Sequence, residues 1–450
     1  MVRKGTEYMT YEPVLGLEIH IELATKSKMF CACSADYFNK DPNTHTCPIC
    51  LGLPGAMPVA NELAIKFTHL IGLALRCEVL LSSKFDRKNY FYPDLAKGFQ
   101  ISQYDLPFTQ NGFLEIRNEV KNKRIGITRA HLEEDTGKLI HTKVDGKDVT
   151  LIDFNRSGVP LIEIVSEPEM NSSEEAKAYA QKIQQVVRYI GASDADMEKG
   201  SMRIEPNVSL RKKGGKGLPN YKVELKNINS FKFAAAAIEY EIKRQSELLY
   251  KGETPAQETR GWNENKNQTV SQRSKEEAHD YRYFPEPDLP PFSFKRDYLL
   301  ELKKDLPELP DEKLKRFAKD FQLSAYDAEI LIRSRKIAQY FEETVMAGEK
   351  VSVNPKKIAN EIINKKPDIE NILPAELVRQ IYKSSQTIDS SEEEIKKVIG
   401  EVLAENKKAV EDYRSGKENA IMFLVGQILR KIGKKIETEK IKSMLIKKLK

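Results

Sequence analysis

The sequence predicts a protein that mixes strands and helices up to about residue 293 and continues with helices alone. Residues 17–23 alternate strictly between apolar and polar side chains, as a strand with one buried face does. From Leu299 onward aromatic residues become few and apolar residues recur at helical spacing. Between these parts, residues 280–291 contain four prolines, which can continue neither a helix nor a central strand. This stretch therefore marks a domain edge.

Length and composition exclude several classes of protein. The 450 residues suffice for two or three domains, each with its own core. No run approaches the roughly 18 apolar residues that a membrane span needs. The first residues lack the apolar core of a signal peptide, so we expect a cytoplasmic protein without a membrane partner.

Capping and turn signals define the elements of the first part. A strand is predicted over residues 11–25, and Asn61 caps a helix that runs to about Leu75. Asn111 and Gly112 together are typical of a hairpin turn. A capping box at residues 172–175 opens an amphipathic helix that Gly191 ends.

Later elements follow the same signals. We predict two strands and then a series of helices. The strands are Ser201–Leu210 and Lys222–Lys226; the helices are Phe231–Tyr250, Pro310–Phe321, Ala325–Ser334, Ile337–Ala347, Pro355–Lys365 and Ala420–Leu429. A serine-rich stretch, residues 384–391, indicates a linker before the last helices.

Four of the five cysteines form two close pairs, Cys31 with Cys33 and Cys47 with Cys50. Two thiol pairs separated by a short loop can close on one tetrahedral ion, and zinc is the ion that four thiolates suit. Four thiolates leave no open position, so this zinc would be structural. Free thiols or a single disulfide are the alternative. His45 is a further candidate for a zinc ligand. Cys77 stands alone in an apolar stretch and belongs to a core.

Acidic and histidine side chains on strand-like segments give a second chemical signal. Residues 160–165 are apolar apart from Glu163, and a buried carboxylate is costly unless it is paired or bound to a metal. Strand alternation puts Glu18, His20 and Glu22 on one face. We hypothesise that these segments converge on a divalent cation that handles phosphates. Its ligands would be Glu18, His20, Glu163 and either Glu133 or Glu134. The alternative is three unrelated strands with solvated polar faces.

The net charge of +6 is concentrated at the C-terminus. Residues 430–450 contain nine Lys or Arg and two Glu, a net charge of +7, so the preceding residues sum to about −1. A basic end on a neutral body suggests a polyanionic partner such as nucleic acid. A solvated, lysine-rich helix end explains the charge equally well.

Several long motifs, in order along nearly the whole chain, closely resemble the B subunit family of the glutamyl/aspartyl-tRNA amidotransferases. The motifs are Gly16–His20, Phe85–Asp94, His131–Asp135, Leu161–Pro168, Glu224–Phe231, Asp280–Pro287 and, in the tail, Phe423–Gln427. The resemblance implies an α+β fold with a cradle-like catalytic domain built on antiparallel sheet with helices. It implies three domains: residues 1–293, the cradle with a zinc-binding insert at 31–50; residues 294–387, an all-helical domain; and residues 388–450, a small helical tail that binds tRNA.

The implied reaction is the ATP-dependent conversion of misacylated Glu-tRNA(Gln) or Asp-tRNA(Asn) to the amide. The side-chain carboxylate would be phosphorylated and then attacked by ammonia. The implied assembly is a heterotrimer with an A subunit, which releases ammonia from glutamine, and a small C subunit. The implied cofactors are ATP and Mg²⁺, beside the structural Zn²⁺.

The resemblance also assigns residues. The magnesium ligands would be Glu18, His20, Glu134 and Glu163, with Glu133 as the alternative to Glu134. The candidates for nucleotide contacts are Arg203, Asn207, Lys226 and Asn227. Lys88 resembles the lysine at the mouth of the family's ammonia channel, which Tyr90 and Tyr92 would line.

Two other functions compete with this one. A zinc-ribbon RNA-binding protein without catalysis would explain the cysteines and the basic tail, but it leaves Glu163 without a purpose. The related archaeal protein that serves only Glu-tRNA(Gln) usually carries a large insertion after the catalytic part. Here Pro291 leads to Leu299 without one, which favours the first family.

Overall fold

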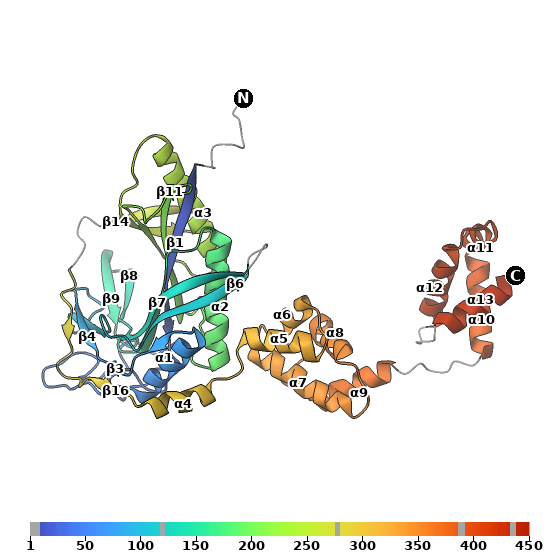
Figure 1. The fold of residues 1–450 in the computed structure, drawn as a ribbon, viewed down its shortest axis with the longest axis horizontal. Helices are drawn as coiled ribbons and strands as arrows, with labels where there is room; N and C mark the ends of the chain where they lie inside the picture. Colours follow the sequence, from blue (N-terminus) through green and yellow to red (C-terminus); the bar gives the residue numbers. More distant parts are fainter. Residues whose placement is uncertain (1–9, 118–121, 275–279, 386–391, 433–437, 450) are drawn as a thin grey trace. The chain divides into compact units, whose positions relative to one another are not determined.

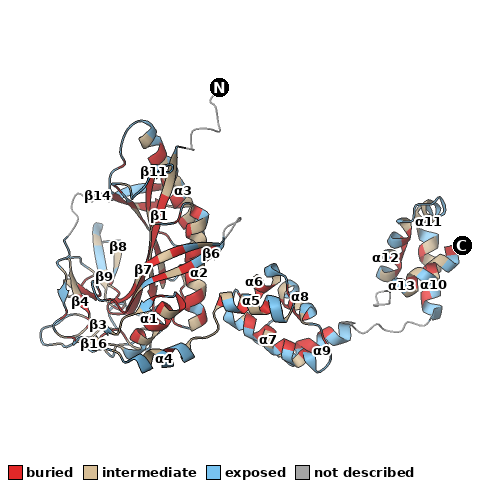
Figure 2. Ribbon diagram, viewed as in Figure 1, coloured by how far each residue is buried: buried red, intermediate tan, exposed pale blue. Residues whose placement is uncertain are grey.

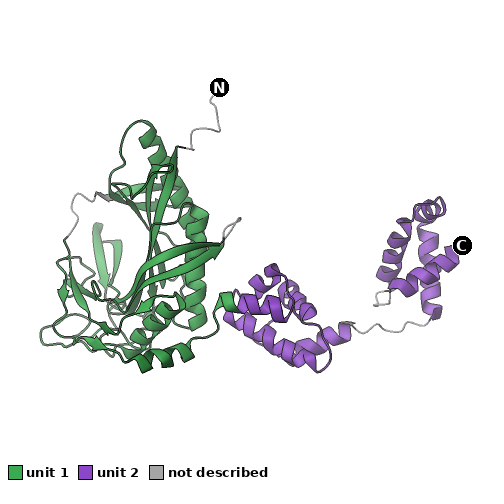
Figure 3. Cartoon of the chain, viewed as in Figure 1, with its two compact units in different colours: residues 1–312 green, residues 313–450 purple. Residues whose placement is uncertain are grey.

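The computed structural model describes residues 10–117, 122–274, 280–385, 392–432 and 438–449. The chain divides into two compact units, residues 1–312 and residues 313–450 (Figure 3). The first unit contains every strand of the described residues, and the second is helical. The predicted change of character in the chain is therefore confirmed. No helix in the described ranges is long and apolar enough to span a bilayer.

A nine-stranded sheet organises the first unit (Figure 1). Its strands follow the order β14-β13-β12-β11-β1-β10-β7-β6-β2, and every neighbouring pair is antiparallel except β12 with β13. In that order the strands are Gln268–Ser274, Glu258–Asn263, Val223–Lys226, Met202–Lys212, Tyr11–Glu22, Pro160–Ser166, Asn122–Glu134, Thr109–Arg117 and Glu78–Val79. The prediction of an α+β fold on antiparallel sheet is confirmed.

One face of this sheet is apolar because β1 alternates as the sequence predicts. Leu15, Leu17, Ile19 and Ile21 are buried in one core with side chains of three helices. These helices are α1 (Glu62–Ala74), α2 (Ser173–Ile190) and α3 (Phe231–Tyr250). They pack on β1, β6, β7 and β11 (Figure 2). The residues between the apolar ones on β1, Glu18, His20 and Glu22, consequently share the opposite face.

The helix signals in this part of the sequence are correct. Ser172 caps α2 by accepting a hydrogen bond from the Glu175 N–H, and Gly191 ends the helix in the left-handed conformation at φ 81°. Asn61 likewise caps α1 through its side-chain oxygen.

The predicted hairpin turn at Asn111 and Gly112 is wrong. Both residues lie inside β6. Asn111 has a positive φ of 55°, and the backbone of Gly112 lies close to the side chain of Cys77. A Cβ on Gly112 would lie 2.3 Å from the Cys77 sulfur. The turn-like dipeptide therefore serves a close approach within the sheet and reverses no strand.

Small sheets flank the large one. The first has the order β15-β4-β5, the second pairs β16 with β3, and the third is the hairpin β8-β9. Their bounds are Phe284–Pro285, Asp86–Asn89 and Phe99–Ser102 for the first sheet, Phe292–Ser293 and Ser82–Ser83 for the second, and Lys138–Val144 and Lys147–Asp153 for the hairpin. The proline-rich stretch thus returns to pair with β4 and β3, which brings residues 281–293 beside residues 82–89.

The remaining helices form two further cores. The first is built by α5 (Pro310–Asp320), α6 (Ala325–Leu331), α7 (Arg335–Glu349), α8 (Pro355–Lys365) and α9 (Pro374–Ser385). The second is built by α10 (Glu392–Glu405), α11 (Lys407–Arg414), α12 (Ala420–Ile432) and α13 (Thr438–Leu449). The predicted boundary at residue 388 lies outside the described residues.

Two helices before the serine-rich linker were not predicted. One is α9, and the other is α4 (Arg296–Asp305), which packs on α1 within the first unit. The sequence carried a signal for α9, because Leu377, Val378 and Ile381 lie on one helical face and are buried. The predicted domain edge at residue 293 lies before α4, whereas the first unit continues to Glu312.

Candidate active site

Polar side chains cross the sheet in a row on the face opposite the three helices. The antiparallel registers place His131 of β7 opposite Glu163 of β10, Glu163 opposite His20 of β1, and His20 opposite Arg203 of β11. Residues directly opposite one another in antiparallel strands share a face and bring their side chains together. Four strands from distant parts of the sequence thus contribute to one line of charged groups.

Two imidazoles and two carboxylates form the centre of this row. The His20 Nε2 atom lies 3.5 Å from Glu163 Oε2 and 3.8 Å from Glu133 Oε1. The His131 Nε2 atom lies 3.3 Å from Glu163 Oε2 and 3.7 Å from Glu133 Oε2. Ser102 adds a hydrogen bond to Glu133. Potential ligand atoms of His20, Glu133 and Glu163 all lie within 4.8 Å of one another.

The charges in this group stabilise one another. Burial lowers the pKa of His20, but the carboxylates, Glu163 first, raise it to about 9. Burial raises the pKa of Glu163, yet the imidazoles of His131 and His20 outweigh it and hold that pKa well below its ordinary value. Two ionised carboxylates this deeply buried need a cation between them. Protonated His20 meets that need here, and a divalent cation can meet it in its place.

His131 contacts both carboxylates of the group. Its Nδ1 atom accepts a hydrogen bond from Nε of Arg129, so its own proton sits on Nε2, toward Glu163 and Glu133. A histidine in this state orients carboxylates and does not itself bind a metal through Nε2. His131 was not among the predicted site residues, although its position two residues before Glu133 predicts the same face.

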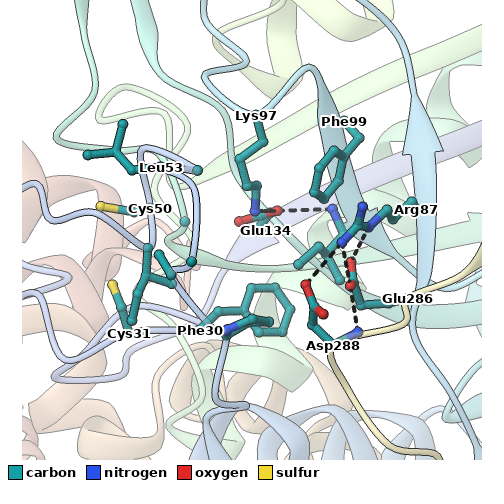
Figure 4. A pocket seen from close by; sticks show the side chains of 17 residues that line it. Phe30, Cys31, Cys50, Leu53, Arg87, Lys97, Phe99, Glu134, Glu286 and Asp288 are labelled. Carbon is teal, nitrogen blue, oxygen red and sulfur yellow. Dashed lines mark hydrogen bonds and ion pairs between the residues drawn. The ribbon is translucent and has the colours of Figure 1, made fainter.

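The structure selects Glu133 over Glu134. Consecutive residues of a strand point to opposite faces, so Glu134 leaves the polar row. Its carboxylate pairs with Lys97 and accepts the N–H of Ile101 at 2.9 Å. In Figure 4 it points into a separate pocket, which Arg87, Glu286 and two of the cysteines also line. The preference for Glu134 as a metal ligand is therefore corrected.

Glu18 is placed in a second, neighbouring group. Its carboxylate and those of Glu205 and Glu224 offer atoms within 4.8 Å of one another. Glu18 faces this group and not the first because it lies two residues from His20, about 7 Å farther along β1. Burial, together with the carboxylates of Glu163 and Glu205, raises the pKa of Glu18. The assignment of Glu18 to the same ion as His20 is corrected accordingly.

Two of the predicted nucleotide contacts lie beside this second group. Lys226 Nζ is 3.1 Å from Glu205 Oε2 and 3.4 Å from Glu224 Oε1. The Asn207 amide donates to Glu18 Oε1 at 2.9 Å. Asn227 follows the end of β12 and is exposed, with a positive φ of 61°. Sequence reasoning missed Glu205 and Glu224, which only the register across β11 and β12 brings to Glu18.

Lys88 stands close to the first group as a buried cation. Its ammonium lies 5.0 Å from the ring centre of Tyr281 and 5.9 Å from that of Tyr90. Burial lowers the pKa of Lys88, but the carboxylates of Glu133 and Glu163 more than reverse this and raise it. The lysine therefore stays charged. Tyr92 is largely exposed.

The four paired cysteines come together as the spacing predicts. Their sulfur atoms all lie within 4.8 Å of one another, whereas Cys77 is buried in the main core. His45 does not join the four sulfurs among the described residues. A hydrogen bond from Cys31 lowers the pKa of Cys50 to about 5, although burial opposes this. Buried Lys28 donates to the Cys50 sulfur at 3.7 Å and adds positive charge beside the cluster.

Comparisons with known proteins agree with this geometry. Residues 13–300 match the GatB/GatE catalytic domain, and residues 354–449 match the GatB domain. The chain is 46% identical to the B subunit of the aspartyl/glutamyl-tRNA(Asn/Gln) amidotransferase of Carboxydothermus hydrogenoformans, over 98% of this chain and 99% of that protein. It is 45% identical to the protein of the same name from Thermoanaerobacter pseudethanolicus, over 94% of this chain and 96% of the relative.

A third relative of that name, from Caldicellulosiruptor saccharolyticus, is 44% identical over 94% of this chain and 95% of its own length. Similarity of this extent covers the strands of the nine-stranded sheet, the helices of the second unit and the residues of the polar row. The resemblance that the sequence motifs suggested is confirmed: the chain belongs to the GatB family.

Proposed function

We propose that this chain is the B subunit of a tRNA-dependent amidotransferase. It uses ATP to activate the side-chain carboxylate of Glu-tRNA(Gln), Asp-tRNA(Asn) or both, and ammonia then converts the carboxylate to the amide. The observation that carries the proposal is the convergence of His20, Glu133 and Glu163 on one face, in a chain that matches proteins of this name from end to end.

The chemistry explains why such a face is needed. A carboxylate resists nucleophiles because it is charged and offers no good leaving group. Its oxygen bonds to the γ-phosphorus of ATP while the bond to the β–γ bridging oxygen breaks, and ADP leaves with the electron pair. Ammonia then bonds to the carbonyl carbon, the bond from that carbon to the phosphate oxygen breaks, and a proton is lost from nitrogen.

Phosphoryl transfer depends mainly on positioning and on neutralised charge. His20, Glu133 and Glu163 offer one imidazole and two carboxylates, a donor set that suits Mg²⁺ or Mn²⁺. When bound there, the ion would neutralise phosphate charge. His131 holds both carboxylates in place.

The second group includes two of the residues that the sequence offered as nucleotide contacts. Asn207 and Lys226 offer an amide and an ammonium beside the carboxylates of Glu18, Glu205 and Glu224. We assign the nucleotide to this end of the face. Asn227, next in the chain after Lys226, is the third contact of this set.

The path of ammonia ends near Lys88. Its charged ammonium sits among tyrosine rings next to Glu133 and Glu163, at the border of the first group. We assign Lys88 to the mouth of the ammonia channel and Tyr90 and Tyr92 to its lining. Ammonia must remain unprotonated to react, and a path enclosed by aromatic side chains favours the neutral form.

The remaining assignments concern zinc, partners and location. Four convergent sulfurs fit a structural zinc ion, and the adjacent Lys28 offsets part of the thiolate charge. A glutaminase A subunit and a small C subunit would complete the heterotrimer, and the basic tail would contact tRNA. A cytoplasmic location, where thiols stay reduced, suits this cluster.

The direct test is mass analysis of the amino acid released from each misacylated tRNA after incubation with the purified complex, glutamine and ATP. Amidated product from either tRNA supports the proposal, and the pair of results defines the substrate. Hydrolysis of ATP without amidation, or no turnover in the complete complex, would contradict it.

The alternatives gain no specific support. A zinc-ribbon RNA-binding protein without catalysis would not need a row of buried carboxylates and imidazoles. For the archaeal protein, the expected insertion has no place, since β16 is followed almost directly by α4.

A further inference from the structure

Arg203 lies at the end of the polar row and is only partly paired. Its side chain is 31% exposed, and one terminal nitrogen is bound by Asp135. Its Nε atom is buried and has no hydrogen-bond partner in the described part of the chain. Arg203 stands directly opposite His20 across β1 and β11. One edge of the guanidinium is therefore anchored, and Nε is left without an acceptor.

The anchor behind Arg203 is rigid. Asp135 is 3% exposed and also pairs with Arg156, at 3.7 Å, and with the N–H of Thr136. A buried carboxylate held between two guanidinium groups fixes the orientation of both.

The unpaired Nε is one of several such atoms on this face. The others are Nδ1 of His20 and Oδ1 of Asn207, on β1 and β11. A buried, charged donor without a partner loses its hydration, and this penalty exceeds the net stabilisation that one hydrogen bond provides. Unpaired buried donors are therefore rare in native proteins. Unpaired polar atoms on adjacent strands indicate that a polar ligand completes this face. Oδ1 of Asn207 is an acceptor, so an anion would pair with the nitrogen atoms and not with this oxygen.

The chemistry of Arg203 selects an oxyanion. A guanidinium offers donors in a fixed plane that match a carboxylate or a phosphate. The acidic groups around it are Asp135, Glu22 and Glu205. An anionic substrate needs a cation in these surroundings, and Lys226 lies at the second group, beside Glu205 and Glu224.

The reaction has two anionic substrates, the phosphates of ATP and the side-chain carboxylate of the aminoacyl group, and the positions of the cations distinguish them. Asn207 and Lys226, beside the second group, are assigned to the nucleotide, whereas Arg203 faces His20 of the first group. We propose that Arg203 binds the side-chain carboxylate of the aminoacyl group and presents it for activation. This removes Arg203 from the set of nucleotide contacts. The inference rests on the proposed function.

The test compares Arg203→Gln and Arg203→Lys with Arg211→Gln in the assembled complex. Arg211 is a matched control, because it lies on the same strand, is 32% exposed and pairs with Glu12. For Arg203→Gln we expect kcat/KM for misacylated tRNA to fall about 10- to 100-fold, the loss of a hydrogen bond to a charged group, with the KM for ATP unchanged. Arg203→Lys keeps the charge but not the planar donors and should lose most of the same activity.

A second measurement excludes a merely structural role. The wild-type complex should bind Glu-tRNA(Gln) more tightly than the amidated Gln-tRNA(Gln), because only the former carries the carboxylate. Arg203→Gln should abolish this difference while leaving the affinity for uncharged tRNA unchanged. A loss of stability alone would lower the active fraction without changing the ratio.

The outcomes separate the inference from the function on which it rests. A wild-type complex that forms no amide contradicts the proposed function. An active wild type with unaltered tRNA discrimination in Arg203→Gln overturns only the role of Arg203. A raised KM for ATP, with kcat/KM for tRNA retained, returns Arg203 to the nucleotide.

Discussion

His20 and Glu163 face each other across β1 and β10, with His20 Nε2 3.5 Å from Glu163 Oε2. They are far apart in the sequence, and the antiparallel register alone brings them together. Each holds the other in its charged form, since Glu163 raises the pKa of His20 and the imidazoles lower the pKa of Glu163. The pair is the simplest part of the site to test.

Glu163→Gln should abolish ATP cleavage that depends on misacylated tRNA, by about 100-fold or more, because a carboxylate that neutralises a metal ion and orients phosphate is lost. Phosphate release by the complex measures it. Glu12→Gln, near the start of β1 in the same sheet, is the control and should keep normal turnover. Near-normal turnover in Glu163→Gln would remove this residue from the mechanism.

Glu133→Gln should weaken Mn²⁺ binding at least about 10-fold, whereas Glu134→Gln should leave it within about twofold, because only Glu133 shares a face with His20. Titration followed by the electron paramagnetic resonance signal of free Mn²⁺ measures both. The reverse order would restore Glu134 to the metal site.

Cys31→Ser should release one zinc ion per chain and lower the melting temperature by roughly 5 °C, equivalent to about 2 kcal/mol, because the ion holds both ends of the loop between Cys33 and Cys47. Metal analysis and thermal unfolding give the two values. Cys77→Ser, in the core and outside the cluster, should keep its zinc. Wild-type protein without bound zinc would contradict the site.

The first unit should lose stability in acid through His69. This side chain is fully buried among the rings of Phe108, Phe294 and Tyr298, and burial lowers its pKa to about 4. The histidine of the unfolded chain takes up a proton near pH 6.5, whereas the folded one does so only near pH 4. The free energy of unfolding therefore falls by about 1.4 kcal/mol for each pH unit between pH 6.5 and pH 4.

Urea unfolding followed by fluorescence of Trp262, the single tryptophan, measures this effect in the first unit. His69→Phe removes the titrating group, so its free energy of unfolding should fall less than that of the wild type between pH 7 and pH 5. Equal losses in both proteins would show that other groups cause the acid sensitivity.

Removing residues 392–450 should weaken tRNA binding about 10-fold at physiological salt, and the effect should shrink as salt rises, because the basic tail acts through phosphate contacts. Filter binding at several salt concentrations measures it. The deletion takes out one complete hydrophobic core, so the rest of the chain should keep its fold. An unchanged dissociation constant would exclude the tail from tRNA binding.

The sequence determined what depends on short-range pattern. Strict alternation over residues 17–23 gave the strand and its polar face, caps at Asn61 and Ser172 gave the starts of α1 and α2, and cysteine spacing gave the thiol cluster. These features follow from local geometry: the strand period of two, the unpaired N–H groups of a first helical turn and the reach of a short loop.

Only the tertiary structure decided which acids meet. Glu133 and Glu134 are equivalent in the sequence, and the strand β10 beside β7 determines which of them faces Glu163. Likewise Glu18 joined Glu205 and Glu224, and His131 and Asp135 became partners of residues far away in the chain. Strand order and register arise from packing of the whole sheet, and a shift of one residue would turn every polar side chain of a strand to the other face.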